Sequence, residues 1–467
     1  MITKFIKRIL RRDPMDRHTH ANHSGAPKRI PKKSHRIDPH LLSKNAVKVT
    51  QTLQQAGFEA FIVGGAVRDL VLGIAPKDFD VATNATPDQV QRLFRKARLI
   101  GRRFQIVHVT FFGKGHPEII EVSTFRALLD NAGDHVAESG RILRDNVWGS
   151  QGEDATRRDF TINAMYYDPS TETVLDYHGG MIDMQKKTLR MIGDPVKRYR
   201  EDPVRMLRAI RFAAKTGFTL DINTREPIAK LGNLLHDVPS ARLFDEILKL
   251  LMSGYSWAAI QGLKNAGLHH GLLPLLDHIL ENEATSNAAN NFVKLALANT
   301  DQRIQSGKSV SAGFLFATLL WPDLLKNWQA NIAKGMANIP ALQDAMDETI
   351  AAQSNGMTIQ RRFESDMREI WSMQPRFEKR LGRYPYRLME SPRFRAGYDF
   401  MLLRCATGEQ NPSLGEWWTS FIAADPATQE ALLASAKAEL GNTTSTTNKR
   451  RRRRKSKSPS APESTPS

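Results

Sequence analysis

The stretch FIVGGAVRDLVLGIAPKDFDVAT, from Phe61 to Thr83, joins an apolar run, two adjacent glycines and two closely spaced aspartates. The apolar run Ala60 to Val63 ends in glycine and predicts a short buried strand, after which a helix is expected to follow Gly65. Two glycines between a strand and a helix let the backbone approach a ligand and place amide groups at a helix start, where a phosphate is favoured. A tight turn alone would also explain Gly64 and Gly65.

The second half of this stretch contains Asp78 and Asp80. If the segment is a strand, both carboxylates point to one face, while Phe79 and Val81 point to the other. Two carboxylates in one small volume repel each other and raise each other's pKa, so a divalent cation is their natural partner. A solvated turn is the alternative, but the position after a Gly-Gly turn favours metal-assisted chemistry on a nucleotide phosphate.

The sequence around this stretch predicts an α+β protein. Ala46, Val49 and Leu53 recur at helical spacing, and the segments QIVHVTFF (105–112) and IIEVSTF (119–125) have the β-branched and aromatic content of strands. The polar stretch between residues 127 and 151 is expected to be a mobile loop. Beyond about residue 190 the pattern is helical, so we expect a small mixed sheet followed by an all-helical half.

Composition limits the possible functions. The chain has 467 residues, of which 41% are hydrophobic, enough to bury the cores of two to four domains. Cys405 is the single cysteine, which excludes an intramolecular disulfide and favours a reducing compartment, with the cytoplasm as the expected location. We find no apolar span of about 18 residues, so no transmembrane helix is expected. The N-terminus also lacks the pattern of a signal peptide.

The formal net charge of +18 is concentrated at the two ends of the chain. Residues 1–40 and 442–467 are strongly basic, and both are expected to be disordered because they are poor in apolar residues. Nucleic acid is the favoured partner of such tails, although an anionic membrane would attract the same charge. The amphipathic start MITKFIKRIL could make weak, transient membrane contact.

A third motif, EDATRRDFTINAM, runs from Glu153 to Met165. A planar guanidinium can bind phosphate oxygens through two hydrogen bonds, so Arg158 is the candidate triphosphate ligand. Asp159 could be a further metal ligand or hold a ribose hydroxyl, or it could simply pair with an arginine. Glu121 competes with Asp159 as the third carboxylate, because a charged residue among apolar strand neighbours usually needs a partner.

The fourth motif, REDPVRMLRAIRFAAKTGF, predicts a helix with Asp202 as its N-cap and Pro203 at its first position. One side of this helix is apolar, and Arg205 and Arg208 lie on an adjacent stripe. A carboxylate accepts a hydrogen bond from the amine of adenine, and an arginine donates one to a ring nitrogen, so Asp202 and Arg205 could read the base edge. A plain cap and a solvated arginine are the alternative.

The segments VGGAVRDLVLG, PKDFDVAT, RRDFTINAM and EDPVRMLRAIRFAAKTGF, in this order, resemble the bacterial nucleotidyltransferases that include poly(A) polymerases and CCA-adding enzymes. VPSARLFDEILKLL, SPRFRAGYDFMLLRCATG and the basic tail resemble the poly(A) polymerase branch in particular. The resemblance covers roughly residues 40 to 425. It implies addition of AMP from ATP to RNA 3′ ends, with a CCA-adding enzyme and a non-catalytic RNA-binding adaptor as the alternatives.

The resemblance also implies roles for individual residues and regions. Asp78 and Asp80 would hold Mg²⁺, Asp159 would be catalytic with Glu121 as its rival, and RNA-decay proteins are candidate partners. The nucleotide-binding residues would be Gly64, Gly65, Arg68, Arg158, Asp202, Arg205 and Arg208. The expected regions are a basic extension (1–40), a catalytic head (41–190), a helical neck (191–255), a helical RNA-binding body (256–440) and a disordered tail (441–467).

Overall fold

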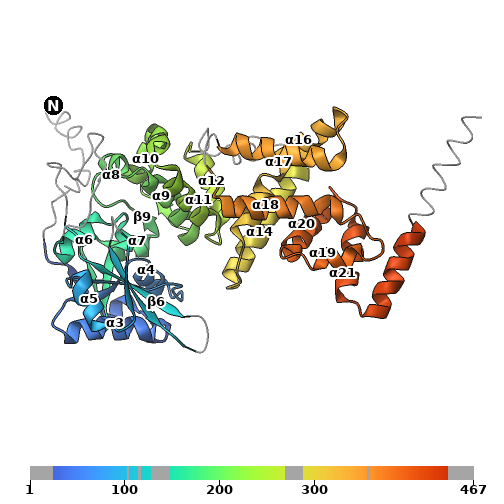
Figure 1. The fold of residues 1–467 in the computed structure, drawn as a ribbon. Helices are drawn as coiled ribbons and strands as arrows, with labels where there is room; N and C mark the ends of the chain where they lie inside the picture. Colours follow the sequence, from blue (N-terminus) through green and yellow to red (C-terminus); the bar gives the residue numbers. More distant parts are fainter. Residues whose placement is uncertain are drawn as a thin grey trace, which may run out of the picture. The chain divides into compact units, whose positions relative to one another are not determined.

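The computed structural model describes residues 25–101, 105–113, 117–127, 148–268, 288–354 and 358–439. Within these residues the chain forms two compact units, one ending at Asp237 and the other beginning at Val238 (Figure 1). The first unit contains the sheet and the second is helical, as the α+β prediction requires. The boundary between the units falls inside the predicted neck, so the finer division into head, neck and body stays a prediction.

The first unit is built on an eight-stranded sheet with the order β1-β8-β7-β2-β3-β6-β5-β4. Its strands are β1 (Lys28–Pro31), β2 (Ala60–Val63), β3 (Asp80–Thr83), β4 (Ala97–Ile100), β5 (Ile106–Phe111), β6 (Glu118–Thr124), β7 (Met165–Asp168) and β8 (Thr173–Asp176). Strands β3 and β6 are parallel and the other neighbours are antiparallel, so the sheet is mixed as expected. A separate pair, β9 (Thr188–Leu189) and β10 (Thr219–Leu220), is parallel.

The strand predictions at 105–112 and 119–125 are confirmed by β5 and β6. Strand β1 corrects another prediction, because Lys28–Pro31 pairs with β8 although it lies within the predicted disordered extension. Ile30 explains the pairing, since this apolar side chain is buried in an otherwise exposed basic strand. Residues 1–24, most of the loop predicted at 127–151, and the tail from residue 440 lie outside the described residues.

The described part of the first unit also contains helices. They are α2 (Lys32–His35), α3 (Lys44–Gln55), α4 (Gly65–Val71), α5 (Pro87–Leu93), α6 (Gln151–Arg157), α7 (Gly180–Lys186), α8 (Pro195–Glu201), α9 (Val204–Thr216) and α10 (Ile222–Leu231), with 3-10 turns at Pro39–Leu41, Thr161–Asn163 and Gly232–Asp237. Helix α3 forms where the sequence predicted it, capped by the Ser43 side chain. Helices α3 and α5 pack against strands β2 to β6 on one face of the sheet (Figure 1).

The second unit is a stack of helices. They are α11 (Ser240–Leu251), α12 (Ser256–Asn265), α14 (Ala288–Gln305), α15 (Ala312–Leu319), α16 (Trp321–Ala333), α17 (Asn338–Ser354), α18 (Arg361–Met373), α19 (Tyr384–Met389), α20 (Phe394–Ala406) and α21 (Pro412–Ala423), with a 3-10 turn at Gln374–Arg376 and a further helix over residues 426–439. Its core is aromatic: Phe244 stacks on Phe316, and Trp418 is fully buried against Phe377.

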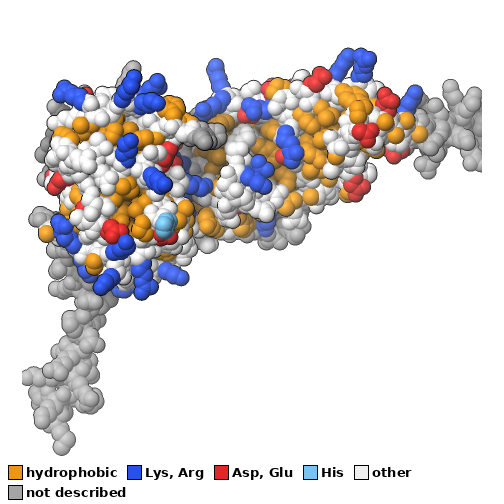
Figure 2. Space-filling view, turned by 90° about the horizontal axis from the view of Figure 1, so that it is seen from below, with side chains coloured by type: hydrophobic (Ala, Val, Ile, Leu, Met, Phe, Trp, Pro, Cys, Tyr) orange, Lys and Arg blue, Asp and Glu red, His pale blue; other side chains and the backbone are white. Residues whose placement is uncertain are grey.

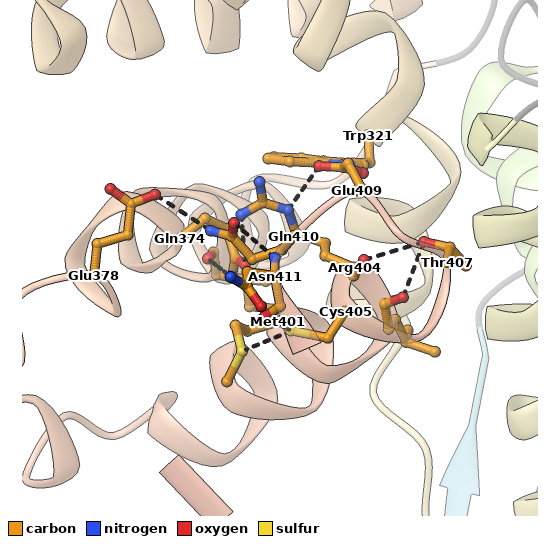
Figure 3. Close-up of polar contacts among 12 residues, drawn as sticks. Trp321, Gln374, Glu378, Met401, Arg404, Cys405, Thr407, Glu409, Gln410 and Asn411 are labelled. Atoms are coloured by element: carbon orange, nitrogen blue, oxygen red, sulfur yellow. Dashed lines mark hydrogen bonds and ion pairs between the residues drawn. The ribbon is translucent and has the colours of Figure 1, made fainter. Parts of the chain in front are cut away.

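A buried polar cluster links helices of the second unit (Figure 3). Arg404 Nε donates to Glu409 at 2.7 Å, and the Trp321 indole N–H donates to the other oxygen of that carboxylate at 2.8 Å. Arg404 also donates to Gln374 and lies over the Trp321 ring. The charge of Arg404 is thus compensated inside the core, which marks the cluster as structural.

No helix in the described parts of the chain is long and apolar enough to cross a bilayer.

Candidate active site

Asp80 lies at the centre of the site, at the first position of β3. It pairs in register with Val63 of β2 on one side and with Glu121 of β6 on the other. Residues in register share a face of the sheet, so the carboxylates of Asp80 and Glu121 are neighbours. Burial, together with the charges of Glu121 and Asp78, raises the pKa of Asp80 to about 6, and Arg158 opposes this rise.

Asp78 lies in a bend just before β3 rather than on the strand itself. The predicted alternation nevertheless holds, because Phe79 and Val81 are buried while Asp78 is exposed and Asp80 is only partly buried. The effect of Asp78 on the pKa of Asp80 also places the two carboxylates close together. The strand was thus expected two residues too early, since β3 begins at Asp80, and the role of Asp78 and Asp80 as a metal-binding pair stays a prediction.

The two glycines form the turn between β2 and α4. Gly64 has a φ of +72°, a conformation that side chains disfavour, and Gly65 begins α4. A Cβ at Gly64 would lie 3.2 Å from Nη1 of Arg158 and 3.9 Å from Oδ2 of Asp80. The backbone conformation thus favours glycine, and a Cβ would also press on the Arg158 guanidinium. The turn brings backbone, a carboxylate and a guanidinium to one point, and the phosphate site proposed there from the sequence stays a prediction.

Arg158 is held rigidly at this point. Its Nε donates to the Tyr166 hydroxyl at 3.2 Å, and its Nη2 donates to Asp154 at 3.1 Å. Burial lowers the pKa of Arg158, but Tyr166 and Asp154 outweigh that effect and raise it overall. Sequence reasoning missed both partners, although Asp154 and Arg158 have the i,i+4 spacing of a helical ion pair.

Asp159 has a different environment from Asp80. Arg208 donates to it from Nε at 2.8 Å, and Asn163 and the Phe160 N–H also donate to its other oxygen. Burial raises the pKa of Asp159, but Arg208 and these hydrogen bonds lower it to about 2. Of the two rivals for the third carboxylate, the structure places Glu121 beside Asp80 and places Asp159 in an ion pair with Arg208.

Arg68 lies deeper than expected of a triphosphate ligand. Its side chain is 3% exposed, and it donates to Asp69 and to Asn163 Oδ1 at 2.7 Å. Lys215 also binds Asp69, at 3.0 Å. Arg68 still lies close to the glycine turn, because a Cβ at Gly65 would lie 3.6 Å from Arg68 Nη2. In this conformation Arg68 packs behind the turn, and its guanidinium is bound by Asp69 and Asn163.

Asp202 and Arg205, the proposed base readers, lie at the junction of α8 and α9. Asp202 is the C-cap of α8, whereas Pro203 occupies the N-cap position of α9 and the helix starts at Val204. The predicted N-cap at Asp202 is therefore wrong by one residue. Arg205 donates to Glu201 at 3.1 Å and to the Arg198 carbonyl at 2.9 Å, so its guanidinium is held beside the junction.

Arg198 is a residue that sequence reasoning missed. It is buried, and its Nη2 donates at 2.6 Å to the carbonyls of both Arg157 and Arg158, while Nη1 donates to Glu201. Burial and the charge of Arg205 lower the pKa of Arg198 to about 10. The i,i+3 and i,i+4 spacings of Arg198, Glu201 and Arg205 were the available signal.

The site can be tested for its fit to a metal ion. Within the described ranges, no three or more His, Cys, Asp or Glu side chains converge as a complete metal-binding group. Mg²⁺ commonly uses one or two carboxylates and takes further ligands from substrate phosphates and water. Asp78 and Asp80 provide two carboxylates, and burial together with the nearby Glu121 raises the pKa of Asp80, so a cation would favour its ionised form. The donor set fits Mg²⁺ bound together with a nucleotide.

Three family models match the chain. They are described as the poly A polymerase head domain (residues 60–190), the probable RNA and SrmB-binding site of polymerase A (residues 217–280), and the polymerase A arginine-rich C-terminus (residues 334–457). The first includes Gly64, Asp80 and Arg158. The third includes part of the basic tail, where the sequence alone gave only composition.

Individual relatives agree with these matches. Poly(A) polymerase I of Salmonella typhi is 45% identical over 414 residues, covering 86% of this chain and 88% of the relative. That of Haemophilus influenzae is 42% identical, covering 85% and 88%. The CCA-adding enzyme of Bacillus subtilis is 40% identical but covers only 51% of this chain and 57% of its own.

A solved structure supports the fold. The CCA-adding enzyme of Bacillus stearothermophilus in complex with CTP matches with a TM-score of 0.54 and 25% identity, covering 90% of this chain and 99% of that one. The match to poly(A) polymerases extends through both units, whereas the curated CCA-adding relative matches about half of the chain. The chain therefore belongs to the bacterial poly(A) polymerase I branch of the tRNA nucleotidyltransferase/poly(A) polymerase family.

Proposed function

We propose that this chain is a template-independent polynucleotide adenylyltransferase, which adds AMP from ATP to RNA 3′-hydroxyl ends and releases pyrophosphate. One observation carries the proposal: Asp80, Gly64 and Arg158 meet at one point, with Glu121 beside Asp80. This arrangement joins a cation site to a phosphate site. Family membership supports the choice of AMP and of RNA, because the long matches are to poly(A) polymerases.

In this proposal Asp78 and Asp80 hold Mg²⁺. When bound, Mg²⁺ would act as a Lewis acid toward the phosphate oxygens and the RNA 3′-hydroxyl. Glu121 is the preferred third carboxylate, because it lies next to Asp80 on the sheet. Asp159 instead holds Arg208, because their ion pair is short, at 2.6 Å, and the Asp159 carboxylate is buried.

Arg158 and the glycine turn position the triphosphate. The guanidinium is fixed by Tyr166 and Asp154 before any ligand arrives, so little reorganisation is needed on binding. Gly64 allows the phosphate to approach the backbone closely. Because phosphoryl transfer needs positioning and charge stabilisation more than covalent help, these two elements supply most of what the protein must provide.

Asp202 and Arg205 are proposed to read the adenine edge. Arg205 is held by Glu201 and by the Arg198 carbonyl, and Arg198 in turn holds the backbone on either side of the Arg157–Arg158 peptide. The base site and the phosphate site are thus connected through one buried arginine. A fixed Arg205 favours one base over others, as a polymerase that adds a single nucleotide requires.

The remaining parts of the proposal rest on the family. RNA would bind through the helical unit and the basic tail, and the product would be directed to RNA turnover with the help of RNA-decay proteins in the cytoplasm. The match to an RNA and SrmB-binding segment supports this role for residues 217–280. Weak membrane contact of residues 1–12 is a secondary proposal, tested by whether their deletion changes the cell fraction that holds the protein.

The decisive experiment supplies Mg²⁺ with either ATP or CTP, and offers either an unstructured RNA or a transfer RNA that lacks its 3′ end. We expect long A tails on the unstructured RNA with ATP and little use of CTP. Ordered addition of C, C and A confined to the transfer RNA would replace the proposal with a CCA-adding enzyme. RNA binding without any nucleotide addition would leave an adaptor.

A further inference from the structure

One half of the sheet in the first unit has a face that the described helices do not cover. On β6, Glu118 accepts hydrogen bonds from Ser43 and Asn45 at the start of α3, so this residue points toward the helices. Side chains alternate along a strand, so Ile119 and Glu121 point to the other face. Ile119 is 44% exposed and the Glu121 side chain is 51% exposed. We call this surface of β6, β5 and β4 the open face.

A row of in-register residues runs from the active site across the open face. Asp80 pairs with Glu121, Glu121 with His108, and His108 with Arg98. His108 Nε2 lies 3.4 Å from Glu121 Oε1, which confirms that these side chains share a face. Neighbouring strands lie about 4.8 Å apart, so Arg98 on the edge strand is roughly 14 Å from Asp80. The row starts with carboxylates and ends with an exposed arginine.

The outer part of the open face combines an exposed aromatic ring with basic side chains. Phe112, directly after β5, is 68% exposed, and the Lys96 ammonium lies 4.1 Å from the centre of its ring. Lys96 and Arg98 are both exposed and, being two residues apart, belong to the same face. Ile100, 41% exposed, extends the apolar part of this surface. Figure 2 shows basic side chains interspersed with hydrophobic ones on one side of the first unit.

We infer that the open face is the binding surface for the 3′-terminal segment of the RNA primer. Its 3′-hydroxyl lies at Asp80 and Glu121, an upstream base stacks on Phe112, and Lys96 and Arg98 contact phosphates. Exposed aromatic rings beside basic residues are the general means of binding single-stranded nucleic acid without reading its sequence. This suits an enzyme whose own product continually becomes its primer.

Two observations favour RNA over a protein partner. The surface is continuous with the catalytic carboxylates through one row of paired residues, and its outer charge is positive, complementary to phosphate. The distance between the two ends of this surface supports the same assignment. Two strand spacings separate β3 from β5, and the rise along β5 leads on to Phe112, which places Phe112 roughly 17 Å from Asp80. A primer of a few nucleotides spans this distance, whereas a dinucleotide does not.

The test rests on the proposed function and compares primers of different length. Phe112→Ala should raise KM for an oligo(A) primer about five-fold or more, because five-fold corresponds to the lower end of the energy of one base stack. KM for ATP should stay unchanged. With the dinucleotide ApA as primer, the same variant should match the wild type. Phe112→Trp should restore the oligo(A) value. An equal effect on both primers would refute stacking at Phe112.

A matched pair of charge variants completes the test. Arg98→Ala should reduce the magnitude of the log-log salt slope for oligo(A) binding by about 0.7. Arg92→Ala is the control, because Arg92 is also exposed but lies on α5, against the opposite face. Equal slopes for the two variants would overturn the assignment and leave a protein as the occupant. A wild type that adds no AMP would instead overturn the proposed function.

Discussion

Replacing Asp80 by asparagine should abolish AMP transfer and yet stabilise the metal-free protein at neutral pH. The pKa of Asp80 is raised from 3.8 to about 6, chiefly by burial and by Glu121. A carboxyl group whose pKa is raised on folding binds its proton more tightly in the native state, so native stability falls as the pH rises from about 4 to about 6. Above pH 6 the ionised carboxylate therefore opposes folding.

The size of this effect follows from the pKa. A rise from 3.8 to about 6 corresponds to about 3 kcal/mol at pH 7, and partial exposure of Asp80 to solvent reduces it, so we expect a gain of about 1 to 3 kcal/mol for Asp80→Asn. Asp159→Asn should have the opposite sign. The pKa of Asp159 is lowered to about 2 by Arg208 and its hydrogen bonds against the effect of burial, so its charge contributes about 2 kcal/mol above pH 4, lost as the pH falls toward 2.

The assay is native-state hydrogen exchange of β2 and β3 amides, in EDTA at pH 7, read by mass spectrometry. These strands lie at the centre of the sheet, so their exchange reports the stability of the first unit. Exchange should slow in Asp80→Asn and accelerate in Asp159→Asn, and Mg²⁺ should slow it in the wild type more than in Asp80→Asn. Faster exchange in Asp80→Asn would refute the charge assignment of Asp80, and slower exchange in Asp159→Asn would refute that of Asp159.

Three further predictions concern activity and RNA binding. Asp78→Ala should abolish AMP transfer with little effect on folding, because Asp78 is exposed; substantial residual activity in a tailing assay would show that the metal site is misplaced. Arg198→Lys should raise KM for ATP and increase misincorporation of CTP more than it lowers kcat, because a lysine cannot bind both carbonyls and Glu201 as the planar guanidinium does; an unchanged ATP-to-CTP preference would exclude this positioning role. Deleting residues 442–467 should flatten the salt dependence of RNA binding, measured by titration at several salt concentrations, with kcat at saturating RNA unchanged; parallel slopes would mean that the tail does not contact RNA.

Local patterns predicted the parts of the site that depend on local structure. Strand β2, the Gly64 turn and the Asp78–Asp80 pair lie within one segment, where a period of two and a glycine break are enough to place side chains. The pairing of β3 with β6 could not be read in the same way, because parallel strands are brought together by distant segments of the chain. For that reason Glu121 could be identified as a candidate but not preferred to Asp159.

The arginines show the same limit more strongly. Sequence can identify Arg68, Arg158 and Arg205 as cations, but whether each meets a ligand or a protein carboxylate depends on tertiary contacts. Arg68 is bound by Asp69 and Asn163, and Arg205 by Glu201, and neither partnership follows from a phosphate-binding motif. Arg198 contacts backbone carbonyls, which no sequence pattern specifies.

The distribution of charge compensation explains why the cation site lies where it does. Asp154, Asp159 and Asp183 are each bound by an arginine inside the fold, so their charges are already balanced. Asp80 differs because its in-register neighbours are apolar Val63 and acidic Glu121, and the pKa-lowering effect of Arg158 does not cancel their influence. A cation arriving with the nucleotide therefore gains most at Asp80. The same sheet register extends to the exposed Arg98, so one pairing pattern sets both the metal site and the approach that we infer for the primer.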